Sequence, residues 1–485
     1  MRKHLIFLLL LLPTSLIWLS CGGPSSSGSK TSGIAYRAFV SDSVTAGTSS
    51  AGVYIVDAQN DIHPGLLGPI AAGNTPGMMV VTPNRSQTLV FSGNNLLSSD
   101  NTFNIINNAT ETNAAHVTLP GYTESFVASP DSSTAYVAVP NAAVVGQPQG
   151  AVEVVSLSAG AFAGEIDIPS VHYLSINNGG DRILAFSDVL SQLAAPCDTT
   201  PSYLFVVTPS NVNVQQCPAV PLPGVNYPFD HPVQAYFSSD DTTAYVVNCG
   251  AECGGAEASV QKLEMTPNQC QPDGACRPVP ACIPIPGSNP PQCPSNSPPA
   301  ASEALVSGST MYLAGTPYLN GVPSQPCTGQ QTAATTCGLL TIFDLNSMTV
   351  TNSVPIVITD GYHNRIAMGA DGQLFIGART CTEIIPPQPP PQGAEIRGCL
   401  SIYNTQSVAV GSIQAGQVTI PPETGDVTGI QPIATREVVY LVQGQNVQGG
   451  TLYIYDTTTD AVDATEEKKI NNLVGNFVDV KTVDF

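Results

Sequence analysis

The chain has 485 residues and carries 15 Lys and Arg against 36 Asp and Glu, which gives a net charge of −21. This charge excludes nucleic acid as a partner, because the phosphate backbone repels an acidic surface that has no basic stripe. Hydrophobic residues make up 42% of the chain, so the sequence is not that of a disordered acidic tail. The 43 glycines and 42 prolines favour short strands joined by turns over a helical bundle.

Residues 1–20 predict a signal peptide for export. Positively charged side chains occupy positions 2–4, and an unbroken apolar run follows over residues 5–12. Pro13 interrupts the apolar segment, which makes it poorly suited to a stable membrane-spanning helix.

Cys21 follows a small residue and precedes two glycines and a Ser-rich stretch. This arrangement resembles a bacterial lipoprotein signal, in which the cysteine is lipidated and becomes the mature N-terminus. The resemblance implies a lipid on Cys21, a flexible tether over residues 21–33, and membrane attachment through the lipid anchor only. Because no Asp follows the cysteine, the resemblance also implies an outer-membrane lipoprotein at the cell envelope or cell surface. Plain secretion is the alternative.

From residue 34 onward the chain repeats one pattern: an apolar strand, a tight turn and a second strand. A third and a fourth short strand follow each copy after loops of variable length. Four short strands in about 45 to 60 residues are typical of one blade of a β-propeller. The copies lie at Met79–Phe91, Phe126–Val139, Leu174–Phe186, Ala235–Asn248 and Ile366–Gly377, with weaker ones at Glu303–Ala314 and Ile430–Val442.

The stretches Asp131–Val137 and Asp240–Asn248 resemble the YVTN-type β-propeller repeat, whose consensus runs roughly Ser-Pro-Asp-Gly…Tyr-Val-Thr-Asn. The resemblance extends over residues 34–485 and implies an all-β fold, a single closed β-propeller. Counting modules that start near residues 34, 74, 121, 170, 226, 300, 360 and 425 gives eight four-stranded blades, with seven, the family norm, as the alternative. The first module lacks an inner strand. We expect the C-terminal segment Asn476–Val483 to supply it and close the ring, which removes exposed sheet edges.

Apart from Cys21, twelve cysteines remain, an even number that predicts disulfides in an oxidising compartment. Their positions around the predicted strands favour three pairs: Cys197–Cys217, Cys327–Cys337 and Cys381–Cys399. The six cysteines from Cys249 to Cys293 cannot be paired from sequence. They fall in a Pro-rich insert near residues 249–300, which we expect to be a disulfide-stapled surface loop. The spacing of Cys249 and Cys253 also fits zinc, but no His follows at a useful distance.

Aspartates recur in the predicted inner hairpin turns, for example at Asp131, Asp240, Asp241 and Asp371. Their common position is typical of turn chemistry, so we interpret them as turn residues and not as metal ligands.

Four side chains form a candidate site. Glu124, His172 and His363 have the same register just before the innermost strand of their units, and His231 lies two places earlier in its own unit. Because this loop lies at one mouth of the channel, we expect the four to face a common space. Such a ring could bind a ligand or a divalent metal, or act as acid and base. The alternative is that each side chain hydrogen-bonds to a neighbouring blade.

The sequence contains no nucleophile elbow, zinc-protease motif, phosphate-binding loop or dinucleotide fingerprint. We therefore predict a non-enzymatic binding or interaction scaffold, a monomer that needs no cofactor and whose partner is a protein, a glycan or a small ligand. Some YVTN-type propellers resemble lactonases, whose active groups lie at this mouth. The alternative is thus a lactonase-like hydrolase, or a metal-binding propeller, that uses Glu124, His172, His231 and His363.

Overall fold

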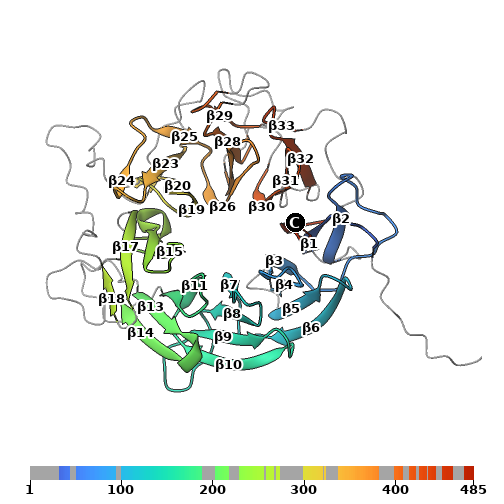
Figure 1. Cartoon of the computed structure of the whole chain (residues 1–485), viewed down its shortest axis with the longest axis vertical. Helices are drawn as coiled ribbons and strands as arrows, with labels where there is room; N and C mark the ends of the chain where they lie inside the picture. Colours follow the sequence, from blue (N-terminus) through green and yellow to red (C-terminus); the bar gives the residue numbers. More distant parts are fainter. Residues whose placement is uncertain are drawn as a thin grey trace, which may run out of the picture.

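The computed structural model describes residues 32–43, 51–93, 100–187, 203–217, 229–255, 258–266, 269–272, 299–319, 322–323, 337–381, 398–407, 414–421, 425–433, 435–443, 451–462 and 475–484. In it, eight β-sheets form a ring around a central channel (Figure 1). The helical segments of this part of the chain are two short 3-10 turns, η1 (Pro209–Asn211) and η2 (Gly250–Cys253), and none of its helices could cross a membrane.

Seven of the eight sheets, blades 2 to 8, are antiparallel meanders whose first strand lies nearest the channel (Figure 1). Blade 2 consists of β3 (Pro76–Val81), β4 (Gln87–Ser92), β5 (Thr102–Asn107) and β6 (Thr112–Thr118). Blade 3 consists of β7 (Ser125–Ala128), β8 (Thr134–Val139), β9 (Ala151–Ser156) and β10 (Ala161–Asp167). Blade 4 consists of β11 (Val171–Ile176), β12 (Ile183–Ser187), β13 (Tyr203–Thr208) and β14 (Asn213–Cys217).

Blade 5 consists of β15 (Pro232–Phe237), β16 (Thr243–Asn248), β17 (Ser259–Thr266) and β18 (Gln269–Pro272). Blade 6 consists of β19 (Glu303–Ser307), β20 (Thr310–Gly315), β23 (Gly338–Asp344) and β24 (Thr349–Val350), and β25 (Ile356–Ile358) also pairs with β23. Between β20 and β23 the chain forms a small separate hairpin of β21 (Tyr318–Leu319) and β22 (Val322–Pro323). Blades 7 and 8 consist of β26 (Tyr362–Met368), β27 (Gln373–Arg379), β28 (Leu400–Asn404) and β29 (Val418–Thr419); and β30 (Val427–Pro432), β31 (Val438–Gln443), β32 (Thr451–Asp456) and β33 (Ala461–Val462).

Blade 1 closes the ring. It joins β1 (Arg37–Asp42) and β2 (Gly52–Asp57) to the C-terminal strand β34 (Phe477–Thr482), which pairs antiparallel with β1 and aligns Val40 with Val480. The innermost strands then contact one another in the order β34, β3, β7, β11, β15, β19, β26, β30 and back to β34. The predictions of eight blades and of closure by the C-terminal segment are therefore confirmed.

The hydrophobic core is divided into eight layers, one between each pair of neighbouring blades. Successive side chains of a strand point to opposite faces, so each strand contributes to two layers. In β1, Phe39 packs towards blade 2, whereas Ala38 and Val40 pack towards blade 8. Every blade thus buries both faces, but only against its neighbours.

The aspartates of the inner hairpin turns accept hydrogen bonds from their own turn or from a neighbouring turn, as expected for turn residues. Asp131 Oδ1 accepts a hydrogen bond from the backbone N–H of Ser133 at 3.0 Å, and Asp240 Oδ1 accepts one from Thr242 N at 3.1 Å. Asp241 instead reaches the previous blade, where Gly179 N donates to its Oδ2 at 2.8 Å. These contacts fix the turns and fasten neighbouring blades together.

Of the predicted disulfides, Cys381–Cys399 is confirmed. Cys249 pairs with Cys253, which resolves one pair of the unassigned six as a disulfide and not a zinc site. Cys337 is disulfide-bonded, but its predicted partner Cys327 lies outside the described residues, as do Cys197, Cys21 and residues 273–298 of the insert. The first part of that insert contains β17 and β18, the outer strands of blade 5.

Replacing Phe477 by Ala should destabilise the whole ring. Phe477 is fully buried in the layer between blades 8 and 1. We expect the free energy of unfolding in urea to fall by about 3–5 kcal/mol, because a cavity is left where the ring closes. The matched control is Phe162→Ala, whose side chain on β10 is 51% exposed and which should cost about 1 kcal/mol or less. Equal losses for the two variants would contradict the importance of the closure.

Candidate functional site: the channel mouth

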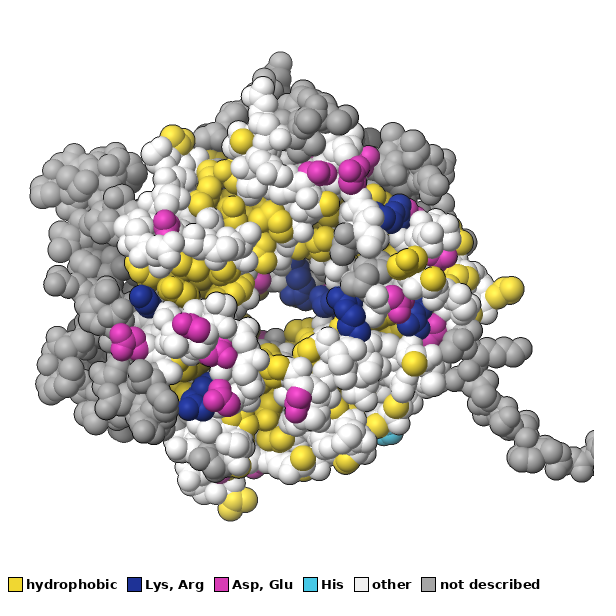
Figure 2. Space-filling model, viewed as in Figure 1, with side chains coloured by type: hydrophobic (Ala, Val, Ile, Leu, Met, Phe, Trp, Pro, Cys, Tyr) yellow, Lys and Arg dark blue, Asp and Glu magenta, His cyan; other side chains and the backbone are white. Residues whose placement is uncertain are grey.

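A cavity of about 660 Å³ lies at the channel mouth where the innermost strands begin. We call it the channel-mouth cavity. Because every innermost strand runs in the same direction, residues far apart in the sequence meet there. Its polar and charged lining comes from blades 3 to 7: Tyr122, Thr123, Glu124, Ser125, Tyr173, Gln234, Ser302, Glu303, Tyr362, Asn364, Arg365 and Arg379. Figure 2 shows that the ring is hollowed at its centre and that Lys and Arg side chains gather along one side of the opening.

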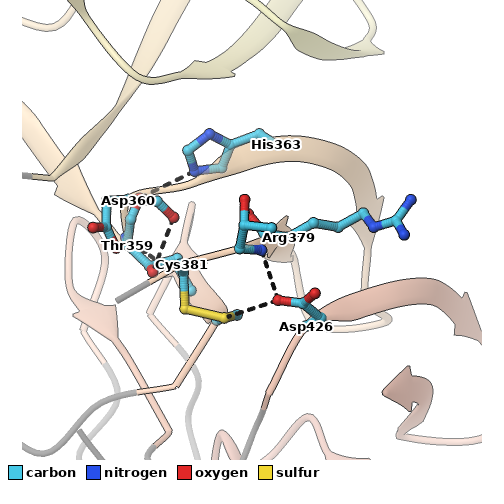
Figure 3. The surroundings of a disulfide bond; sticks show 9 residues. Thr359, Asp360, His363, Arg379, Cys381 and Asp426 are labelled. Atoms are coloured by element: carbon cyan, nitrogen blue, oxygen red, sulfur yellow. Dashed lines mark hydrogen bonds between the residues drawn. A yellow bond between two sulfur atoms is a disulfide. The ribbon is translucent and has the colours of Figure 1, made fainter. Parts of the chain in front are cut away.

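Two arginines of blade 7 supply the positive charge of the cavity. Arg379 ends β27, next to Tyr362 on β26, and its side chain extends away from the nearby Cys381–Cys399 disulfide (Figure 3). Among the described residues its guanidinium has no hydrogen-bond or ion-pair partner. Arg365 donates to the carbonyls of Thr428 at 2.8 Å and Asn364 at 2.7 Å. Carbonyl oxygens orient a guanidinium without neutralising its charge.

The two carboxyl groups of the cavity offset this charge only in part at neutral pH. Burial raises the pKa of Glu303 to about 7, although the nearby Arg365 lowers it in part, so a large fraction of this side chain is protonated near pH 7. Glu124 is engaged by His172, whose Nδ1 lies 2.9 Å from Glu124 Oε2. The cavity is therefore far less negative than the chain as a whole.

Tyrosines from opposite sides of the ring complete the mouth. Tyr362 of blade 7 and Tyr173 of blade 4 both line the cavity, from strands on opposite sides of the channel (Figure 1). Burial raises the pKa of Tyr362 and, together with the charge of Glu124, that of Tyr122. These phenols stay protonated at neutral pH and can donate hydrogen bonds to a ligand.

The structure brings together only two of the four predicted site residues, Glu124 and His172. His231 Nδ1 lies 3.0 Å from Asp230 Oδ1, on its own loop. His363 is completely buried and its Nε2 contacts the carbonyl of Thr359 at 3.1 Å (Figure 3). No group of three or more His, Cys, Asp and Glu side chains that could hold a metal occurs among the residues that the structure describes.

Strand irregularities explain why the common register fails. The β26–β27 register shifts between His363 and Arg365, and the β11–β12 register shifts between Val171 and Tyr173. Tyr362 and His363 precede the shift in β26 and alternate normally, so Tyr362 lines the cavity while His363 turns away from it. Gly338 makes room for the His363 ring, since a Cβ there would lie 2.6 Å from His363 Cε1. Sequence reasoning missed Glu303, Arg365 and Arg379.

Comparison with known proteins supports the fold. The chain matches no protein-family model and no curated protein. Among solved structures, the dihydro-heme d1 dehydrogenase NirN in complex with DHE is similar with a TM-score of 0.55 and 11% identity, over 92% of this chain and 75% of that chain. Two further structures match with a TM-score of 0.48 each. The hydrazine synthase of Kuenenia stuttgartiensis has 13% identity over 81% of this chain and 98% of that chain. The periplasmic gluconolactonase PpgL of Pseudomonas aeruginosa has 14% identity over 92% of this chain and 98% of that chain. At these identities the likeness shows the fold alone: the protein is an eight-bladed β-propeller.

The buried His363 should make the protein sensitive to acid. Burial lowers the pKa of His363 to about 4, whereas an unfolded His titrates near about 6.5. Protonation therefore favours the unfolded chain, and this group's contribution to stability is lost as the pH falls from about 6.5 towards 4. In urea unfolding, we expect the free energy of unfolding to fall between pH 6.5 and pH 4 by about 2–3 kcal/mol less in His363→Gln than in the wild type. The exposed His116→Gln is the control, and an unchanged pH slope in His363→Gln would contradict the prediction.

Proposed function

We propose that this propeller is a binding protein that takes a small anionic molecule with hydroxyl or carbonyl groups into the channel-mouth cavity. The observation that carries the proposal is the pair of arginines on blade 7: Arg365 and Arg379 face the cavity in a chain whose net charge is −21. A guanidinium without a protein partner is suited to a carboxylate or phosphate, which it can bind through two parallel hydrogen bonds.

The size and the remaining lining support the same ligand class. A volume of about 660 Å³ falls within the range of about 300–1,000 Å³ that is usual for small-molecule sites. The phenols of Tyr122, Tyr173 and Tyr362 and the amides of Gln234 and Asn364 supply hydrogen bonds for hydroxyl and carbonyl groups.

We further infer that the protein is exported, held at the cell envelope by a lipid on Cys21, and built from YVTN-type repeats. The disulfides Cys249–Cys253 and Cys381–Cys399 support export, because such bonds persist in oxidising compartments. The Ser-Pro-Asp turn at Asp131 supports the repeat type, since this aspartate caps its own turn.

Isothermal titration calorimetry with tartrate, citrate and glucuronate as probes tests the ligand class. We expect at least one of these acids to bind, and Arg379→Gln to weaken that binding at least about tenfold, because hydrogen bonds to charged groups contribute about 1.5–3 kcal/mol. The control is Arg182→Gln, in the turn at the far end of the innermost strand of blade 4. The proposal fails if no acid binds to the wild type, or if Arg379→Gln binds as tightly as the wild type.

A further inference from the structure

At the edge of the channel-mouth cavity, three side chains lie in a row. Ser170 Oγ is 3.5 Å from His172 Nε2, and His172 Nδ1 is 2.9 Å from Glu124 Oε2. A hydroxyl, an imidazole and a carboxylate in this order are the parts of a nucleophile activated by a general base. We propose that Ser170, His172 and Glu124 form an acyl-transfer centre that hydrolyses carboxylic esters. This inference goes beyond the proposed binding function and does not rest on it.

The carboxylate determines which imidazole nitrogen can act as the base. A carboxylate accepts hydrogen bonds and cannot donate them, so Glu124 holds the proton on Nδ1 of His172. Nε2 then carries the lone pair and faces Ser170 Oγ. The separation of 3.5 Å is longer than an ideal hydrogen bond, as is common for such pairs before a substrate is bound.

The backbone holds Ser170 in a strained conformation. Its φ of 47° lies in the left-handed region, which is unfavourable for a residue with a side chain. The turn is held from two sides: Ser170 N donates to the carbonyl of Gln149 at 2.8 Å, and the Ser187 hydroxyl donates to the carbonyl of Pro169. Gly150 packs so closely that a Cβ there would lie 2.2 Å from Ser170 N. Strain maintained by the surroundings is frequent at catalytic positions.

A substrate can reach this row of side chains from the cavity. Glu124 and Tyr173, on either side of His172, both line the channel-mouth cavity. The side chains of His172 and Glu124 are 22% and 44% exposed. Glu124 thus links the row to the cavity, and the proposal requires that an ester bound there reaches past Glu124 to His172 and Ser170.

The reaction balances with water as the only co-reactant. Ser170 Oγ attacks the ester carbonyl carbon and forms the new C–O bond, while its proton moves to His172 Nε2. The Glu124 carboxylate stabilises the imidazolium through its hydrogen bond to Nδ1. The bond to the leaving alcohol breaks, and the alcohol oxygen takes the proton from Nε2. Water then gives a proton to His172 Nε2 and attacks the acyl-serine carbonyl carbon. The bond to Ser170 Oγ breaks, Oγ takes the proton from Nε2, and the carboxylic acid is released.

Labelling of the full-length protein with a fluorophosphonate, and hydrolysis of p-nitrophenyl acetate, test the proposal. We expect mass spectrometry to find the phosphonate adduct on the peptide that contains Ser170. Ser170→Ala and Ser170→Gly should abolish the adduct; the Gly variant also relieves the positive φ and so keeps the fold intact. His172→Gln should slow labelling and hydrolysis at least 100-fold, and Glu124→Gln at least tenfold.

Ser158→Ala and His116→Gln are the matched controls, because both residues are exposed and lie away from the cavity, and neither should change the rates. The proposal is overturned if the folded wild type forms no adduct at Ser170. It is equally overturned if Ser170→Gly hydrolyses the ester at the wild-type rate, or if His172→Gln labels as fast as the wild type.

Discussion

The packing of each blade against two neighbours is the constraint on which the rest of the structure depends. Alternation along a strand places apolar side chains on both faces of every sheet, so no blade can bury its hydrophobic surface alone. The innermost strands add polar links between blades: Ser125 Oγ accepts a hydrogen bond from Leu174 N at 3.0 Å, and Ser175 Oγ accepts one from Ala235 N at 3.0 Å. The strand β34 makes such links on both sides, since Asp479 accepts from Met79 N and Thr428 donates to the carbonyl of Phe477.

The same ring produces the site. Because the innermost strands all begin at one mouth, side chains from blades 3 to 7 reach one cavity, and Tyr173 and Tyr362 line it from opposite sides of the channel. The chain as a whole has a net charge of −21, but the cavity contains two guanidinium groups, the carboxyl group of Glu124 and that of Glu303, whose pKa is raised. A charge distribution of this kind attracts anions to the channel without making the whole surface basic.

The sequence contains nearly all the information needed for the fold, because each blade repeats a short strand, a turn and a second strand. The missing inner strand of the first module and the strand-like Asn476–Val483 together predict how the ring closes. Pairing of Cys381 with Cys399 was predictable, since the two cysteines flank a loop between β27 and β28. The Cys249–Cys253 bond was not, because it depends on the short turn η2 that brings these residues together.

The site was less predictable. Glu124 and His172 do meet, but whether a side chain faces the channel depends on a shift of one residue at the start of a strand. In β26 the shift follows His363, so His363 still alternates with Tyr362: Tyr362 lines the cavity and His363 is buried. Arg379 ends a second strand, whereas the residues that the sequence places at the mouth are those just before the first strands. The pairing of Tyr362 with Arg379 across β26 and β27 would have indicated it.

The pairing of β34 with β1 also determines when the ring can close during folding. The first blade formed during synthesis must wait, with one edge of β1 uncovered, until the last strand emerges. A chain that is still on the ribosome therefore cannot close its ring. Until it does, the uncovered edge of β1 can pair with a strand of another chain.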